Sequence, residues 1–159
     1  RNLPDDLLRA IAAKGGVIQA VAYKEFLKHD PAREAAEEKL QQAVAKAAGD
    51  TKYDSDKHDY LPAMAAGMAK IQQQHPLPTL DDYLGQIRHM VQVAGIDHVG
   101  IASDFDGGGG ITGWADASET RNLTAAMRRH GFSDADIAKL WGGNLLRVWG
   151  EVERDAVKH

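Results

Sequence analysis

The stretch "DHVGIASDFDGGGG" at residues 97–110 decides how the rest of the chain is interpreted. Its apolar run at 98–103 predicts a strand, and two aspartates, Asp104 and Asp106, follow directly. Four glycines come next, and glycines let a loop or a ligand approach the backbone closely. Because functional side chains of α/β proteins gather where strands end, Asp104 is the first candidate site residue.

Two other interpretations of the aspartates stand beside this one. Aspartates after a strand also hydrogen-bond local amides in ordinary turns. A calcium loop would place Asp104, Asp106 and Gly109 at the first, third and sixth positions of an EF-hand. That alignment puts Gly108 and Ala115 where oxygen ligands are needed, and a strand rather than a helix precedes it. The calcium interpretation is therefore disfavoured.

The composition sets the broad class of the protein. The chain has 159 residues, 43% of them hydrophobic, which is enough for one domain with a sizeable core. Its formal net charge is −4, and no lysine- or arginine-rich run predicts a nucleic-acid partner. No apolar run reaches the roughly 18–20 residues that cross a bilayer, so no transmembrane segment is predicted. Cysteine is absent, which excludes disulfides, thiolate metal ligands and a cysteine nucleophile.

The predicted elements alternate between helices and strands. The run "VIQAVAY" at 17–23 is short and mostly apolar, as expected for a strand that is buried on both faces in a parallel sheet. Polar, acidic sequence at 49–60 predicts a loop or insertion. Helices are predicted from a cap at Asn2 to Gly15, over 30–48, weakly over 61–74, over about 80–94, from Ser118 to about His130, and from Ser133 onward with a break at Gly142-Gly143.

Two strands are too few for a complete sheet of this kind. Two parallel strands leave both faces and both outer edges without enough cover. The pattern belongs to a larger α/β sheet, either open or closed into a barrel. The chain is therefore predicted to be part of a fold.

The chain's own residues predict no metal site and no familiar nucleophile. The seven histidines are scattered, with no H-x-H or H-E-x-x-H pair. Ser103 lacks the G-x-S-x-G context of a nucleophile elbow. The run "GGGGITG" at 107–113 lacks the G-K-[ST] that completes a phosphate-binding loop.

Three motifs in this order resemble the renal or membrane dipeptidase family of zinc peptidases. They are "RNLPDDLLRAIAAKGGVIQAV" at 1–21, "HVGIASDFDG" at 98–107 and "NLLRVW" at 144–149. The similarity runs from residue 1 to about 156 and is weakest across 50–78. It implies a (β/α)8 TIM barrel of the metal-dependent hydrolase type. It also implies two zinc ions bridged by a glutamate, and hydrolysis of dipeptides with a free C-terminal carboxylate.

The resemblance also implies roles for individual residues. Arg1 corresponds to an arginine that holds the terminal carboxylate of the substrate, which a guanidinium can do with two parallel hydrogen bonds. Asp104 corresponds to a strand-end aspartate that contacts the substrate and handles the proton given to the leaving amine. Phe26 is the nearest match to an aromatic residue that touches the substrate in some relatives, although it lacks a tyrosine hydroxyl. Asp106 is expected to be a structural partner in the loop.

The zinc ligands of the family are not matched in this chain. They are an H-x-D on the first strand, a glutamate and two histidines, and together with a carbonyl-polarising histidine they precede the matched segments. Residues 1–159 are therefore predicted to form the C-terminal part of one dipeptidase barrel domain, with 49–78 as a variable insertion. Two Zn2+ are expected in the complete enzyme, with ligands outside this chain.

Partners and alternatives follow from the same resemblance. The expected partners are a dipeptide substrate, the N-terminal remainder of the barrel and a second copy in a homodimer. The expected compartment is the bacterial periplasm or cytoplasm, decided by a segment before Arg1. Two other functions stay open: a non-catalytic remnant that binds without chemistry because it lacks the metal ligands, and another amide hydrolase of the amidohydrolase type.

Overall fold

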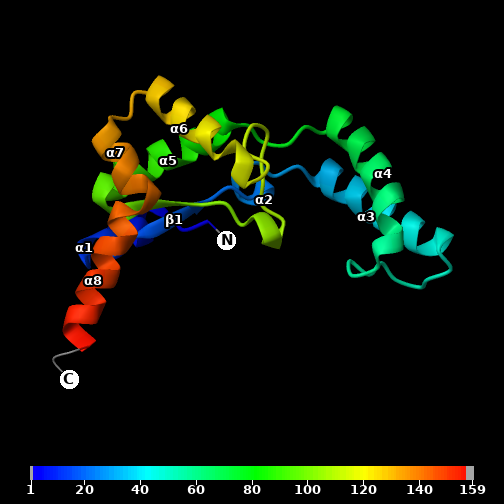
Figure 1. The fold of residues 1–159 in the computed structure, drawn as a ribbon, viewed down its shortest axis with the longest axis horizontal. Helices are drawn as coiled ribbons and strands as arrows, with labels where there is room; N and C mark the ends of the chain where they lie inside the picture. Colours follow the sequence, from blue (N-terminus) through cyan, green and yellow to red (C-terminus); the bar gives the residue numbers. More distant parts are fainter. Residues whose placement is uncertain (1, 157–159) are drawn as a thin grey trace. The chain divides into compact units, whose positions relative to one another are not determined.

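The protein has a mixed α/β architecture, which confirms the predicted α/β class (Figure 1). The computed structural model describes residues 2–156, except for the side chain of His58. The chain divides into two compact units. The first unit comprises Arg1–Lys28 and Pro78–His159, and the second comprises His29–Leu77.

The two strands form a parallel pair in the first unit. Strand β1 (Ile18–Val21) pairs with β2 (Val99–Ala102), with Ile18 opposite Val99 and Val21 opposite Ala102. Both strands are slightly shorter than predicted, because residues 96–98 form a 3₁₀ turn before β2 and the chain leaves β1 after Val21. Since the strands are parallel, the residues that follow each of them lie at the same edge of the sheet.

Helix α5 (Leu80–Ala94) covers one face of the strand pair. It buries Tyr83, Leu84, Ile87 and Met90, whose spacing places them on one side of the helix. They pack in one core with Ala20 and Val99 of the two strands. The other helices of the first unit are α1 (Asp5–Ala13), α2 (Lys24–Leu27), α6 (Thr120–Arg129), α7 (Asp134–Ala138) and α8 (Asn144–Ala156).

The start of α1 differs from the prediction that Asn2 caps it. The N-cap position belongs to Pro4, which makes no side-chain cap bond, so the helix begins at Asp5, beyond the reach of Asn2. The Asn2 side chain instead donates to the carbonyl oxygen of Phe26, at 2.8 Å. Phe26 lies in α2, a four-residue helix that its short length hid from the sequence patterns.

The "NLLRVW" motif fixes the end of the chain to the starts of both strands. Asn144 is buried, and its Nδ2 donates to the carbonyl oxygens of Ile96 and Val99, both at 2.7 Å. Arg147 donates to the carbonyl oxygens of Gly15 at 2.9 Å and Asp97 at 3.0 Å. The motif therefore stabilises the sheet at the end opposite to Asp104.

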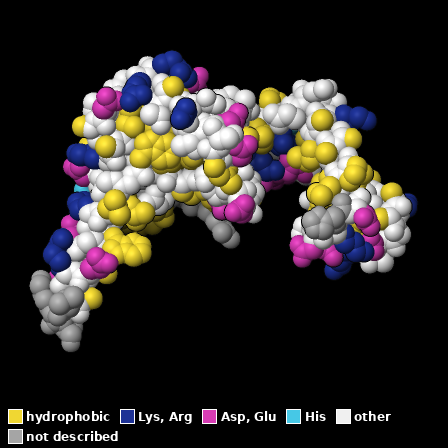
Figure 2. Space-filling view, in the orientation of Figure 1, with side chains coloured by type: hydrophobic (Ala, Val, Ile, Leu, Met, Phe, Trp, Pro, Cys, Tyr) yellow, Lys and Arg dark blue, Asp and Glu magenta, His cyan; other side chains and the backbone are white. Residues whose placement is uncertain are grey.

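Helix α8 follows a break in the helical backbone. Residues Lys139–Gly143 form a π-helical turn with non-helical angles at Gly142, where the sequence predicted an interruption. Figure 2 shows hydrophobic side chains gathered along α8, and its exposed large apolar residues are Leu145, Leu146, Trp149 and Val152. Among residues 2–156, no helix is both long and apolar enough to cross a membrane.

The second unit is a pair of helices, α3 (Pro31–Ala47) and α4 (Leu61–Gln74). Buried Arg33 links them: it donates to Glu37 on α3, at 2.7 Å, and to Gln72 on α4, at 2.9 Å. The predicted loop at 49–60 connects the two helices and ends in a 3₁₀ turn at 58–60. The unit includes α3 as well as most of the region predicted as variable, 49–78.

Candidate active site

The carboxyl ends of β1 and β2 meet and hold the glycine loop between them. Ala22, directly after β1, donates from its backbone nitrogen to the carbonyl oxygen of Ala102, at 2.9 Å. The carbonyl oxygen of Ala22 in turn accepts from the nitrogen of Gly110, at 3.0 Å. The loop 104–110 is therefore anchored to both strand ends.

Asp104 begins this loop in a left-handed conformation, which residues other than glycine rarely adopt. Its φ of 56° and ψ of 34° are left-handed, and it is the one non-glycine residue with positive φ in the described chain. Its carbonyl oxygen accepts from the nitrogens of Gly107 at 3.1 Å and Gly109 at 2.6 Å. A left-handed aspartate is destabilising by itself, and such residues cluster at functional sites.

The side chains of Asp104 and Asp106 are exposed. Neither makes a hydrogen bond to any residue that the structure describes. The turn interpretation is thus correct for the Asp104 backbone, whose carbonyl accepts, but wrong for the carboxylates. Asp106 is likewise not the structural partner in the loop that was expected. The Asp104 carboxylate is therefore accessible to solvent.

The glycines are needed because the loop folds tightly against itself. A Cβ atom on Gly109 would lie 2.0 Å from the carbonyl oxygen of Ser103, which no side chain tolerates. A Cβ atom on Gly107 would lie 2.4 Å from Oδ1 of Asp104. The Asp104 carboxylate therefore occupies the space that a side chain at position 107 would need. Only a glycine at 107 leaves the carboxylate where it is.

Replacing Gly107 by alanine is expected to move the Asp104 carboxylate without unfolding the loop. The clash is with the end of a flexible side chain, so the free energy of unfolding should change by less than about 1 kcal/mol. Because the family resemblance implies that Asp104 handles a proton, kcat/KM for dipeptide hydrolysis is expected to fall by about 10- to 100-fold, since small displacements of a reacting group are costly. Urea unfolding and steady-state hydrolysis measure the two effects.

The matched control is Gly85→Ala on α5, where an added Cβ would meet nothing within 4 Å. This variant should keep its turnover and gain up to about 1 kcal/mol of stability from higher helix propensity. Full turnover in Gly107→Ala would show that the position of the Asp104 carboxylate does not matter for the reaction.

An aromatic pair stands beside the loop at the end of β1. The Tyr23 ring comes within 3.4 Å of the position of a Cβ on Gly108, and its centroid lies 4.9 Å from that of Phe26. Tyr23 is thus the ring that contacts the glycine loop, while half-buried Phe26 packs behind it. Sequence reasoning missed Tyr23. Its signal was its position as the last residue of a predicted strand, close to the signal that selected Asp104.

The described residues do not include Arg1, the predicted carboxylate-binding residue. Its predicted role is therefore a matter for experiment. Its neighbour Asn2 is described, and the bond from Asn2 to the Phe26 carbonyl ties the start of the chain to α2, beside Tyr23.

Tyr83 supports the strand ends from the core side. Its hydroxyl donates to the carbonyl oxygen of Ala20 at 2.6 Å and lies 3.4 Å from that of Ala102. Burial raises the pKa of Tyr83, so the hydroxyl keeps its proton and stays a donor. The centroid of the Tyr83 ring lies 5.8 Å from that of the Trp114 ring. Trp114 in turn contacts Phe105, the residue after Asp104. The loop is therefore anchored in an aromatic cluster.

The described residues alone do not fit a zinc site. No three of their His, Asp or Glu side chains are grouped so that they could hold a metal ion. Histidines of this part of the chain have other partners: His89 lies 2.8 Å from Asp5, His130 lies 2.8 Å from Asp81, and His98 lies 2.8 Å from the carbonyl oxygen of Gly16. That the zinc ligands lie outside this chain stays a prediction.

Comparison with known proteins identifies the family. The sequence matches the membrane dipeptidase family, peptidase family M19, over residues 1–159. The chain belongs to this family. The resemblance of the three motifs is thereby confirmed, and relatives within the family are named as dipeptidases and metallopeptidases.

Individual relatives are considerably longer than this chain. An uncharacterized dipeptidase of Schizosaccharomyces pombe is 29% identical over 160 residues, which are 99% of this chain and 28% of that protein. The structure of the probable dipeptidase PvdM from Pseudomonas aeruginosa is similar with a TM-score of 0.68 and 36% identity, covering 97% of this chain and 41% of that one. The chain thus spans less than half the length of both.

A third relative was solved with a ligand. A metallopeptidase from Rhodobacter sphaeroides, liganded with a phosphinate mimic of the dipeptide L-Ala-D-Ala, has a TM-score of 0.59 and 24% identity. The match covers 91% of this chain and 30% of that one. At this level of identity the likeness shows a shared fold.

Proposed function

We propose that these 159 residues are the C-terminal part of a (β/α)8 barrel that hydrolyses dipeptides with the help of two zinc ions. The observation that carries the proposal is the position of Asp104, exposed at the shared carboxyl edge of two parallel strands in a member of the membrane dipeptidase family. Active sites of barrel enzymes lie at this edge. The parallel pair with α5 on one face supports the proposal, because neighbouring units of such a barrel have parallel strands with helices on one face.

The residues of this chain would bind and orient the substrate. Arg1 would hold the free C-terminal carboxylate of a dipeptide with paired hydrogen bonds. Tyr23 and Phe26 would form an aromatic wall next to it, and Asp104 would lie across the loop from Tyr23.

Asp104 would carry out the proton transfer that amide hydrolysis requires. The attacking water must lose a proton and the leaving amine must gain one when the peptide bond breaks, and an exposed carboxylate at the rim of the site could accept the first and pass it to the amine. The zinc ions that the family resemblance implies would supply an activated water. Their ligands would come from residues outside this chain.

The free carboxylate of the substrate gives a direct test. We expect the complete enzyme to hydrolyse L-Ala-D-Ala with a kcat/KM at least about 100-fold higher than that for the same dipeptide with an amidated C-terminus, because the amide leaves Arg1 without its charge partner. Activity should disappear with a chelator and return with Zn2+. Equal rates for the two substrates would contradict the role of Arg1.

The two other functions make different predictions in the same assay. A non-catalytic remnant would bind the dipeptide without hydrolysing it, even after Zn2+ is added. Another amide hydrolase of the amidohydrolase type would turn over amides that lack an α-carboxylate. The proposed homodimer and the periplasmic or cytoplasmic location are tested separately, by the mass in solution and by fractionation of cells.

A further inference from the structure

Trp114 is a buried ring of the core next to the glycine loop, and only 2% of its surface is exposed. Its backbone is fixed by a close bridge, in which its nitrogen donates to the carbonyl oxygen of Ile111 at 3.0 Å and its carbonyl accepts from the nitrogen of Ile111 at 3.1 Å. Its indole Nε1 donates to Oγ1 of Thr120 on α6, at 3.2 Å. The backbone and the side chain of Trp114 are therefore both held in place.

Three aromatic rings pack on Trp114. The Phe105 ring meets it edge-on, with the centroids 5.3 Å apart and an angle of 77° between the planes. The Trp141 ring also meets it edge-on, at 6.0 Å, and the Tyr83 ring is tilted against it at 5.8 Å. Edge-to-face pairs are favourable because the positive edge of one ring meets the negative face of the other. The Phe105 ring is thus held against a fixed partner.

The position of the Phe105 ring restricts Asp104, because Phe105 is the next residue and consecutive Cα atoms lie about 3.8 Å apart. The left-handed backbone of Asp104 is unfavourable by itself, and such a conformation persists only where the surroundings determine it. The Asp104 carboxylate makes no hydrogen bond to a described residue, so its place depends on that backbone. The contact between Phe105 and Trp114 therefore contributes to fixing the carboxylate.

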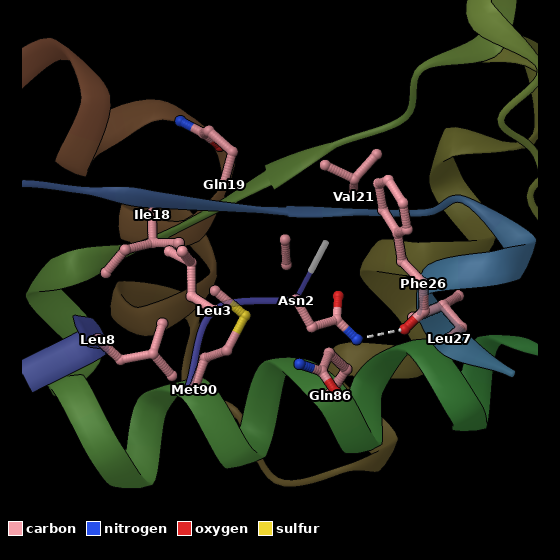
Figure 3. A pocket seen from close by; sticks show the side chains of 11 residues that line it. Asn2, Leu3, Leu8, Ile18, Gln19, Val21, Phe26, Leu27, Gln86 and Met90 are labelled. Atoms are coloured by element: carbon pink, nitrogen blue, oxygen red, sulfur yellow. Dashed lines mark hydrogen bonds between the residues drawn. The ribbon is translucent and has the colours of Figure 1, made fainter. Parts of the chain in front are cut away.

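The aromatic pair at the end of β1 is packed less closely. Phe26, which lies behind Tyr23, lines a cavity of about 230 Å3 between β1, α2 and α5. Figure 3 shows Phe26 at one end of this cavity, with Ile18 of β1 and Met90 of α5 farther along it. A ring that borders a cavity lacks partner atoms on that side. Of the two aromatic supports of the glycine loop, the one through Trp114 is the more rigid.

We propose that Trp114 is the positioning residue of Asp104: through Phe105 it determines where the carboxylate lies, without touching the substrate itself. This inference rests on the proposed function, in which Asp104 handles a proton. A reacting group must be held within about 0.5 Å of its productive position, so a small displacement of Asp104 lowers turnover. Since Trp114 is buried, it acts on the reaction only through the groups that pack on it.

Replacing Trp114 by leucine in the complete enzyme tests the proposal. Without its ring partner Phe105 can shift, so kcat should fall by about 10- to 100-fold. KM should change by less than about threefold and the zinc content should stay the same, because the groups that bind substrate and metal keep their places. Trp114→Phe keeps a ring edge for Phe105, and its kcat should stay within about fivefold of the parent.

Trp141→Leu is the matched control. Trp141 packs on the same ring and also donates from its indole to a threonine of α6, Thr124, at 3.0 Å. Among the described aromatic rings it pairs with Trp114 alone, whereas Trp114 also pairs with Phe105. Both leucine variants should lower the urea midpoint, but kcat of the control should stay within about twofold of the parent.

Phe105→Leu removes the same contact from its half-buried side, where less packing is lost. It gives a second variant that should fold even if Trp114→Leu does not. Its kcat should fall by a similar factor, about 10- to 100-fold. The double variant should be no slower than the slower single variant, because both changes break one contact.

Amide exchange follows Asp104 without any hydrolysis. The nitrogens of Gly107 and Gly109 donate to the Asp104 carbonyl, so their exchange reports the place of that residue. In the complete enzyme both amides should exchange at least about 10-fold faster with Trp114→Leu or Phe105→Leu, and at the parent rate with Trp141→Leu. A parent enzyme that hydrolyses no dipeptide would contradict the proposed function, and the exchange rates would still decide the positioning role.

Several results would overturn the proposal. One is a kcat of Phe105→Leu or Trp114→Leu within about twofold of the parent, and another is an equal loss of kcat in Trp141→Leu. A Trp114→Phe variant as slow as Trp114→Leu would show that the ring contact is not what matters. Effects of Trp114→Leu and Phe105→Leu that multiply would show two independent contributions. Unchanged exchange at Gly107 and Gly109 would equally count against the positioning role.

Discussion

Replacing Asp104 by asparagine is expected to lower kcat of the complete enzyme by about 10²- to 10⁴-fold, the usual contribution of a general acid or base. Asparagine keeps the size of the side chain and its place over Gly107, but it cannot deliver a proton to the leaving amine. The left-handed backbone conformation also tolerates asparagine well, so the loop should keep its structure. Steady-state hydrolysis of L-Ala-D-Ala measures the effect.

The zinc content separates catalysis from metal binding in this experiment. If Asp104 acts on the proton, the variant should keep its zinc and its KM should change much less than kcat. Asp106→Asn is the matched control: it removes an equally exposed carboxylate two residues away, and its kcat should stay within about twofold of the parent. Loss of zinc in proportion to activity would instead make Asp104 a ligand or a structural residue.

Local signals in the sequence predicted most helix starts and both strands. Thr79 and Asp82, like Ser133 and Asp136, have the sequence spacing of a capping pair at a helix start, and each pair forms a reciprocal capping box in the structure. These signals work because the groups that satisfy each other are three residues apart. The short helix α2 has no such signal, since four residues are too few for a periodic pattern.

The sequence predicted only the part of the candidate site that depends on the end of a single strand. Asp104 follows a strand whose apolar run is unambiguous, so its place at the edge of a sheet could be inferred from that run alone. The contact between Tyr23 and the glycine loop depends on the register of β1 and β2, which no local pattern contains. The resemblance pointed to Phe26 instead, the ring that packs behind Tyr23.

The role of Asn144 was also hidden from the sequence, although its motif was recognised. Its two partners, the carbonyl oxygens of Ile96 and Val99, lie 48 and 45 residues away along the chain. The motif is therefore part of the membrane dipeptidase resemblance for a structural reason. It holds the amino ends of the strands, while Asp104 and Tyr23 occupy the carboxyl ends.

Replacing Asn144 by leucine is accordingly expected to destabilise the first unit without affecting the chemistry. The change leaves the buried carbonyl oxygen of Val99 and the half-buried one of Ile96 without their donor, which should lower the free energy of unfolding by about 2–4 kcal/mol. The thermal midpoint should fall by about 2–4 °C for each kcal/mol lost. In urea, the midpoint should fall with an unchanged slope, since the surface exposed on unfolding stays the same.

The matched control is Asn122→Leu on α6, where the asparagine is exposed and donates to the carbonyl oxygen of Gly113 at 3.1 Å. Water can replace that bond, so the loss should stay below about 1 kcal/mol. Below the melting temperature, the complete enzyme with Asn144→Leu should keep its kcat, because the lost bonds lie at the strand ends away from Asp104. A fall in kcat as large as that of Asp104→Asn would mean instead that both ends of the strands act as one unit in the reaction.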